Sequence, residues 1–169
     1  IVDSVHGYPA GATAFSASPS GALLYLPPPL TGTIDWVDRA GAKHPVQIPR
    51  GTPGWPRLSP DGRYAAIHVG GPETRDVWIL DLDRPGTLRQ LTYRGGGFPV
   101  WSHDGRRIAF MSRQEGSGDL YTVLADGSGS PERIVAGART KIPVSWSAAG
   151  VLAYYEIGEA NQRDIIKLR

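Results

Sequence analysis

One short pattern occurs four times in this chain at nearly even intervals. In each copy a serine precedes a glycine by three residues, and an apolar segment follows the glycine. The copies are Ser18-Pro19-Ser20-Gly21, Ser59-Pro60-Asp61-Gly62, Ser102-His103-Asp104-Gly105 and Ser147-Ala148-Ala149-Gly150. A second marker, an aspartate 14 residues after each glycine, opens another apolar or aromatic run at Asp35, Asp76, Asp119 and Asp164. The glycines are 41, 43 and 45 residues apart, so the chain is built from four units of one repeat.

This repeat length predicts the fold class. A period of about 40 to 45 residues with several short strands per unit is typical of a β-propeller, in which each unit is one blade. We therefore predict an all-β fold, a β-propeller of four-stranded antiparallel blades in a single domain. The units are approximately residues 13–54, 55–97, 98–142 and 143–169, with an N-terminal strand at 1–5. Four units make either a complete small ring or part of a larger propeller.

The serine motif is interpreted as the turn between the first and second strands of each blade. Asp-Gly is favoured in such hairpins because glycine accepts a positive φ and the aspartate side chain can cap a nearby backbone N–H. From each marker aspartate to the next serine the spacing is 24, 26 and 28 residues, so the length variation lies outside the inner hairpins. We assign a structural turn role to Gly21, Asp61, Gly62, Asp104, Gly105 and Gly150.

The two ends of the chain complement each other. The fourth unit ends five residues after Asp164 and has no fourth strand, while residues 1–5 precede the first unit at the spacing expected of one. Residues 1–5 could close the ring by pairing with the last strand, or they could finish a blade of a larger propeller. A third alternative is that two copies associate through their blade edges. Because the chain begins at Ile1 and its only methionine is Met111, we expect a processed product or a piece of a longer protein.

Composition and charge exclude several classes of protein. The chain has 22 Gly, 15 Pro and no Cys, which fits a turn-rich all-β domain without disulfides or thiolate metal sites. No apolar stretch approaches the roughly 18 residues that a membrane-spanning helix needs, so we predict no direct membrane insertion. A formal net charge of +2, without a run of basic residues, argues against nucleic acid as a partner.

Short signatures of catalysis are missing. The sequence has no Gly-x-Ser-x-Gly elbow, no His-Glu-x-x-His motif and no phosphate-binding Gly-x-x-x-x-Gly-Lys loop. The four histidines occupy unlike positions within the repeat, which does not favour a shared metal site. We therefore predict that the chain is not an enzyme and needs neither a metal nor a cofactor.

Several segments resemble a known repeat family. Residues 56–63 (PRLSPDGR), 76–82 (DVWILDL), 88–92 (LRQLT) and 99–110 (PVWSHDGRRIAF) are similar to TolB-type, WD40-like propeller repeats. Residues 15–25 (FSASPSGALLY) and 35–41 (DWVDRAG) are similar to the propellers fused to bacterial transmembrane serine/threonine kinases. The resemblance implies a bacterial protein with a periplasmic or extracytoplasmic location. It also implies six or more blades, and the fourth unit departs from it with Ala148-Ala149 in place of Pro-Asp.

Basic and aromatic residues gather where the innermost strand of each blade begins. No acidic residue occurs in the ranges 48–58, 91–100 or 134–144. We predict a ligand-binding site at the channel mouth, formed by Trp55, Arg57, Arg94, Phe98, Arg139 and Lys141. Its ligand would be a protein or peptide, an acidic one in particular, or a small anion. The alternative is that the aromatic residues seal the ring and the basic residues form ordinary solvated surface.

These observations predict a non-catalytic module for binding, sensing or protein interaction. Two other functions stay open. The chain could be the accessory propeller of a serine peptidase or other hydrolase whose catalytic domain is absent from these residues. It could also be a purely architectural piece that contacts only other propeller blades.

Overall fold

A computed structural model describes residues 15–17, 23–25, 33–37, 40–48, 51–84, 86–158 and 162–168. The predicted strand at 1–5 and the predicted turn glycine Gly21 lie outside these residues. Within the described ranges no helix is long and apolar enough to cross a membrane.

Every element is a β-strand, and the strands form antiparallel sheets that follow one another along the chain. The first sheet contains β1 (Phe15–Ala17), β2 (Leu23–Tyr25), β3 (Thr33–Val37) and β4 (Lys43–Gln47). The second contains β5 (Pro53–Leu58), β6 (Tyr64–Val69), β7 (Asp76–Asp81) and β8 (Leu88–Gln90). The third contains β9 (Gly97–Trp101), β10 (Arg107–Ser112), β11 (Asp119–Leu124) and β12 (Glu132–Val135), and the fourth β13 (Thr140–Trp146), β14 (Leu152–Ile157) and β15 (Arg163–Leu168). The prediction of an all-β fold built from four-stranded antiparallel sheets is confirmed.

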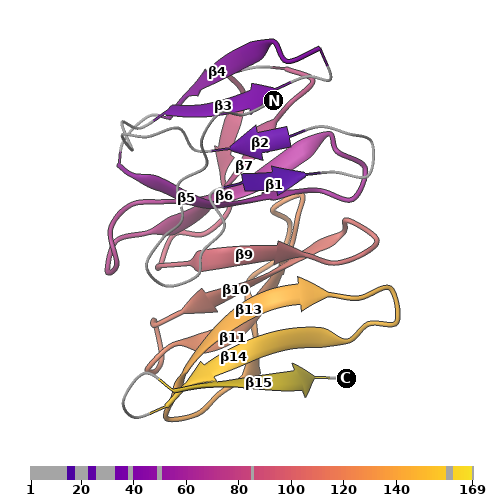
Figure 1. Cartoon of the computed structure of the whole chain (residues 1–169). Helices are drawn as coiled ribbons and strands as arrows, with labels where there is room; N and C mark the ends of the chain where they lie inside the picture. Colours follow the sequence, from indigo (N-terminus) through magenta and orange to yellow (C-terminus); the bar gives the residue numbers. More distant parts are fainter. Residues whose placement is uncertain are drawn as a thin grey trace.

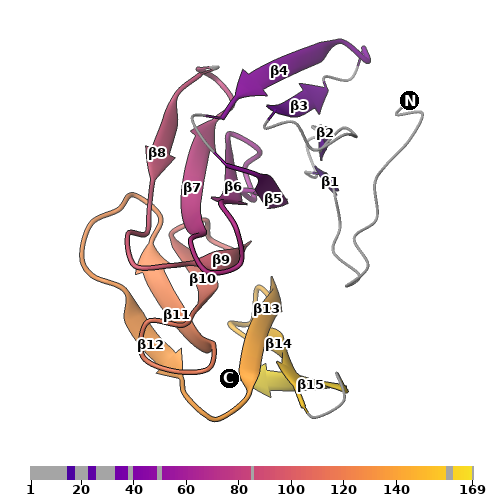
Figure 2. The same cartoon turned by 90° about the vertical axis from the view of Figure 1, so that its left-hand side faces the viewer.

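The four sheets are arranged along an arc with their first strands on its inner side (Figures 1 and 2). Strand β1 contacts β5, β5 contacts β9, and β9 contacts β13. Within the described residues no strand pairing joins the first sheet to the fourth.

The core lies between neighbouring sheets, because the strands of a middle sheet are buried on both faces. Successive side chains of a strand point to opposite faces. On β6, Ala65, Ile67 and Val69 pack with residues of the first sheet, whereas Ala66 packs with the third. A third cluster, around Leu120 and Leu152, joins the third sheet to the fourth. Each fully buried branched side chain contributes about 1.5–3 kcal/mol, so the sheets stabilise one another.

The Ser-x-Asp-Gly motifs form the turns between the first two strands of the second and third sheets. Ser59 Oγ donates to Asp61 Oδ1 at 2.6 Å. The backbone N–H of Arg63 donates to Asp61 Oδ1, and the backbone N–H of Tyr64 donates to Ser59 Oγ. Ser102 and Asp104 form the same contacts one repeat later. Burial acts to raise the pKa of Asp61, but the hydrogen bonds from Ser59 and Arg63 outweigh it and leave that pKa below its ordinary value.

The turn glycines have the conformation that such a hairpin requires. Gly62, Gly105 and Gly150 have φ angles of 74°, 70° and 78°, in the left-handed region that disfavours residues with a Cβ. The fourth turn is one residue shorter than the others, since the backbone of Ser147 pairs with Val151. It also lacks the carboxylate, because Ala149 stands where Asp61 and Asp104 stand in the other turns.

Two marker aspartates, Asp76 and Asp119, fasten the second and third sheets to the connection that leads to the next sheet. Asp76 Oδ1 accepts hydrogen bonds from Thr92 Oγ1 at 2.7 Å and from the backbone N–H of Gly95 at 3.1 Å. Asp119 Oδ1 accepts the backbone N–H of Gly137 at 3.1 Å in the same way. These contacts hold the connections in place, and one of them, between β8 and β9, forms part of the candidate site.

Candidate interaction site

Two of the predicted channel residues meet on the inner side of the arc. The rings of Trp55 and Phe98 make an edge-to-face contact with centroids 4.6 Å apart. Both residues have positive φ angles, 53° and 58°, which are rare for bulky side chains. The indole N–H of Trp55 is buried and has no hydrogen-bond partner among the described residues. The pair therefore combines a strained backbone with an unused donor.

Phe98 also contacts a histidine and an arginine. The ring of His68 lies edge-on to Phe98 at 5.4 Å, and the guanidinium of Arg75 lies 4.9 Å from the centre of the Phe98 ring. Burial, reinforced by the positive charge of Arg75, lowers the pKa of His68 to about 3. His68 is therefore neutral at physiological pH, and its Nδ1 accepts the backbone N–H of Phe98 at 3.4 Å.

Arg57 is two residues beyond Trp55 on β5, and its guanidinium lies 5.9 Å from the centre of the Trp55 ring. The turns between the first two strands of a sheet are called the first turns below. Arg57 lines a cavity of about 230 Å³ together with residues of two of these turns, Ser59, Pro60, Ser102 and His103. Burial lowers the pKa of Arg57, opposed by the nearby Tyr155. The first turns lie at one end of the inner strands, and the connections between sheets lie at the other end.

Arg139 and Lys141 form ion pairs where the third and fourth sheets meet. Lys141 is only 1% exposed, donates to the carbonyl of Arg139 at 2.7 Å, and lies 3.8 Å from Asp119 and 3.9 Å from Glu156. Arg139 is more exposed and lies 3.5 Å from Asp164. The structure therefore brings Trp55, Phe98 and Arg57 together, whereas Arg139 and Lys141 are held in ion pairs with acidic residues of the third and fourth sheets.

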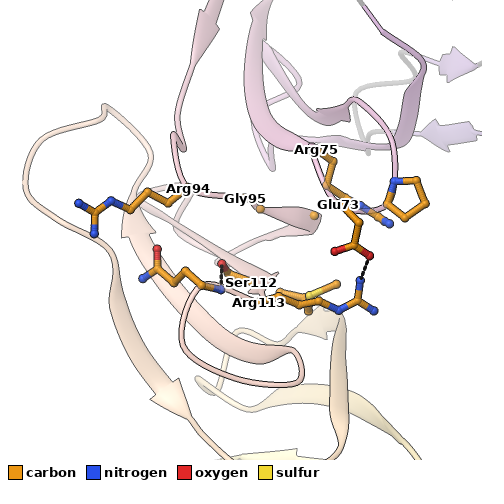
Figure 3. Close-up of a pocket in the computed structure, with 11 residues that line it drawn as sticks. Glu73, Arg75, Arg94, Gly95, Ser112 and Arg113 are labelled. Atoms are coloured by element: carbon orange, nitrogen blue, oxygen red, sulfur yellow. Dashed lines mark hydrogen bonds and ion pairs between the residues drawn. The ribbon is translucent and has the colours of Figure 1, made fainter.

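The sixth predicted residue, Arg94, lines a cleft between the second and third sheets, which we call the rim cleft (Figure 3). Three connections form it: β6 to β7, β8 to β9, and β10 to β11. Its volume is about 200 Å³. The lining residues are Pro72, Glu73, Arg75, Arg94, Gly95, Gly96, Gly97, Met111, Ser112, Arg113 and Gln114.

The rim cleft carries three arginines and one carboxylate. Arg113 Nη1 lies 3.2 Å from Glu73 Oε1, and both side chains are exposed. Within the described ranges neither Arg75 nor Arg94 forms an ion pair, and Arg75 Nε is buried without a hydrogen-bond partner. Burial lowers the pKa of Arg75, the charge of Arg113 lowers it further, and Glu73 offsets part of this effect. The local charge therefore favours an anion.

The glycine run 95–97 leaves room for these side chains. A Cβ on Gly97 would lie 2.5 Å from Cδ of Arg75, and one on Gly96 would lie 2.7 Å from Oγ1 of Thr92. The backbone N–H groups of Gly95 and Gly96 donate to Asp76 and to the carbonyl of Arg75. Because these donors are occupied, the arginine side chains are the anion-attracting groups of the cleft.

Arg94 was the only lining residue of the cleft among the predicted site residues, and the other two arginines, Arg75 and Arg113, were not predicted. Arg75 directly precedes the marker aspartate Asp76, and Arg113 directly follows β10, so both lie between the second and third strands of a blade. Their positions in the repeat were readable from the sequence. That they line the same cleft as Arg94 could not be predicted, because it depends on how two neighbouring sheets pack. Among the described residues no group of three or more His, Cys, Asp or Glu side chains could hold a metal.

Comparison with known proteins identifies the fold. No family profile matches the sequence. A segment of 70 residues is 37% identical to dipeptidyl-peptidase 5 of Porphyromonas gingivalis, covering 37% of this chain and 10% of that protein. TolB of Acinetobacter baumannii has a similar structure (TM-score 0.74, 21% identity), and the match covers 92% of this chain and 40% of TolB. The β-propeller domain of Cps50 (Swd1) from Myceliophteria thermophila is also similar (TM-score 0.63, 19% identity, 93% of this chain and 50% of that one).

These similarities confirm that the chain has the fold of TolB-type and other WD40-like β-propellers. The chain spans less than half the length of TolB and a tenth of the peptidase. The narrower resemblance to the propellers of serine/threonine kinases stays a prediction.

Proposed function

We propose that this chain is a non-catalytic propeller module that binds a protein or peptide partner on the rim formed by the connections between its strands. The observation that carries the proposal is the rim cleft. There, Arg75 and Arg113 lie beside the single carboxylate, Glu73, and Arg94, from a third connection, lines the other side of the cleft with its guanidinium directed away from them. A cleft lined by side chains of one charge favours association with a partner of the opposite charge.

The hydroxyl groups of the repeat motif support a non-catalytic function. Ser59 and Ser102 each donate to the aspartate of their own turn and accept a backbone N–H, so both hydroxyls already have turn partners. The buried His68 is neutral and packs on Phe98, and no serine hydroxyl within the described residues forms a hydrogen bond with it. A nucleophilic serine needs a base within hydrogen-bonding distance.

A second candidate is the accessory propeller of a serine peptidase. It is favoured by the segment that is 37% identical to dipeptidyl-peptidase 5. In that case the hydrolase domain would be encoded beside these residues, and the rim would contact that domain or its substrate. The flanking gene sequence distinguishes the candidates, because a hydrolase of this kind would show a Gly-x-Ser-x-Gly elbow.

Binding to an unbiased array of short synthetic peptides tests the proposed function. We expect the wild-type chain to bind a subset of peptides, Arg113→Ala to reduce this binding, and His103→Ala, at the opposite end of the inner strands, to leave it unchanged. Failure to bind any peptide, or equal loss in both variants, would contradict a peptide-binding rim.

A broad esterase and peptidase screen tests the non-catalytic part of the proposal. We expect no turnover by the purified chain. Turnover that survives repurification and disappears on replacing one serine or one histidine would contradict this part.

A further inference from the structure

We propose that the rim cleft is a carboxylate-binding site in which Glu73 occupies the position of the ligand, so that an acidic peptide segment binds by displacing Glu73 from Arg113. This inference rests on the proposed function and specifies the chemistry of the partner and a competitor built into the chain. Its basis is the ion pair between loops of two different sheets (Figure 3).

Glu73 is held loosely enough to be displaced. Its side chain is 78% exposed. Among the described residues Glu73 forms one ion pair, in which its Oε1 lies 3.2 Å from Arg113 Nη1. An exposed pair of this kind contributes little, because both ions are solvated and two long side chains must be ordered. An incoming carboxylate therefore exchanges one carboxylate–guanidinium contact for another.

Arg75 makes the place of Glu73 attractive to a second anion. Its guanidinium is fixed over the ring of Phe98, and Gly97 leaves space for its side chain. It has no ion-pair partner in the described part of the chain, and its charge interacts with both Glu73 and Arg113. A ligand carboxylate beside Arg113 would gain from Arg75 at no cost in ordering that arginine.

Arg94 extends the site along the cleft. Figure 3 shows its side chain on the far side of Gly95 from Glu73, with its guanidinium directed away from the ion pair. One carboxylate cannot contact Arg113 and Arg94 together in this arrangement. The cleft therefore fits an extended segment with two acidic side chains, one at Arg113 and Arg75 and the other at Arg94, better than it fits a single small anion.

Fluorescence anisotropy with a labelled peptide of alternating glutamate and glycine tests this inference, with the glutamine version of the peptide as control. We expect Glu73→Gln to bind the glutamate peptide about two- to fivefold more tightly, the gain that corresponds to removing one exposed ion pair. Glu115→Gln is the matched control, because Glu115 pairs with Arg133 at 3.2 Å and does not line the cleft. It should leave the affinity unchanged.

A charge reversal within the cleft should have the opposite effect. We expect Arg94→Glu to weaken binding of the glutamate peptide by about tenfold. Arg106→Glu changes the net charge equally at an exposed position outside the cleft, and it should have a much smaller effect. Unchanged thermal unfolding of the four variants would show that the effects arise in binding.

The outcomes separate this inference from the proposed function. Equal binding of the glutamate and glutamine peptides, or no gain from Glu73→Gln, overturns the carboxylate site while peptide binding on the rim stands. Equal loss in Arg94→Glu and Arg106→Glu overturns it as well, because the attraction would then come from net charge alone. If no peptide of any composition binds, the proposed function itself fails.

Discussion

At the scale of the residue, the backbone strain of this structure is concentrated at Trp55 and Phe98. Each lies four residues before the motif serine of its blade, and the pairing of β5 with β6 and of β9 with β10 changes register beside it. A positive φ in a bulky residue costs about 1–3 kcal/mol, and the aromatic contacts with His68 and Arg75 offset that cost. The fourth sheet has Pro143 at the equivalent position, where the ring forbids a positive φ.

The turn glycines provide a residue-scale prediction about stability. Gly62→Val and Gly105→Val place a branched side chain at φ angles of 74° and 70°, so each should lower the free energy of unfolding by about 1–3 kcal/mol. Gly71→Ala is the control, because Gly71 has no positive φ and its added Cβ would meet only Thr74, at an ordinary 3.7 Å. Chemical denaturation measures the effect, and neutral substitutions at the two turn glycines would contradict the assigned hairpins.

His68 predicts a dependence of stability on pH. Its pKa is about 3 in the folded chain, below the ordinary value of 6.5. Between these two pH values the imidazole is therefore protonated in the unfolded chain and neutral in the folded chain. Stability from this group is therefore fully present above pH 6.5 and is lost as the pH falls toward 3, by about 2 kcal/mol between pH 6.5 and pH 5. Denaturation at both pH values should show this loss in the wild type and in His103→Gln, and a smaller loss in His68→Gln. Equal losses in all three would contradict a buried neutral His68.

At the scale of the element, the repeat pattern predicts the turns better than the outer loops. The Ser-x-Asp-Gly turn is recognisable because its hydrogen bonds lie within six consecutive residues, from Ser59 to Tyr64. The rim cleft could not be predicted in the same way, because Glu73 and Arg113 are 40 residues apart and meet only through the packing of two sheets. Direction along a strand also matters. Arg57 is the fifth of the six residues of β5 and lines the cavity beside Ser59 and Ser102, whereas Arg94 lines the rim cleft.

The last strand carries an element-scale prediction about association. β15 pairs only with β14 among the described residues, and Ile165 on β15 is 73% exposed. An unpaired edge with an exposed apolar side chain favours pairing with another chain. We expect Ile165→Lys to reduce self-association measured by light scattering. Tyr93→Lys is the control, since Tyr93 is 74% exposed but lies outside the strands, and it should have no such effect. Equal effects of the two changes would exclude the β15 edge as the cause.

At the scale of the whole molecule, four sheets in an arc present two different ends of their inner strands. One end carries the first turns, with Arg57 and His103 nearby. The other carries the connections that form the rim cleft, with its three arginines. The fold class followed from the spacing of the repeat alone, whereas the division of the predicted site residues between the two ends required the positions of the strands.

Hydrogen–deuterium exchange of the chain, with and without the tightest peptide from the unbiased array, tests most directly whether the rim is the interaction face. We predict that the peptide slows exchange in the three rim connections, residues 70–75, 91–96 and 113–118, and leaves the first turns at 59–63 and 102–106 unchanged. Slower exchange confined to the first turns, or no change in the rim connections at saturating peptide, would contradict the account.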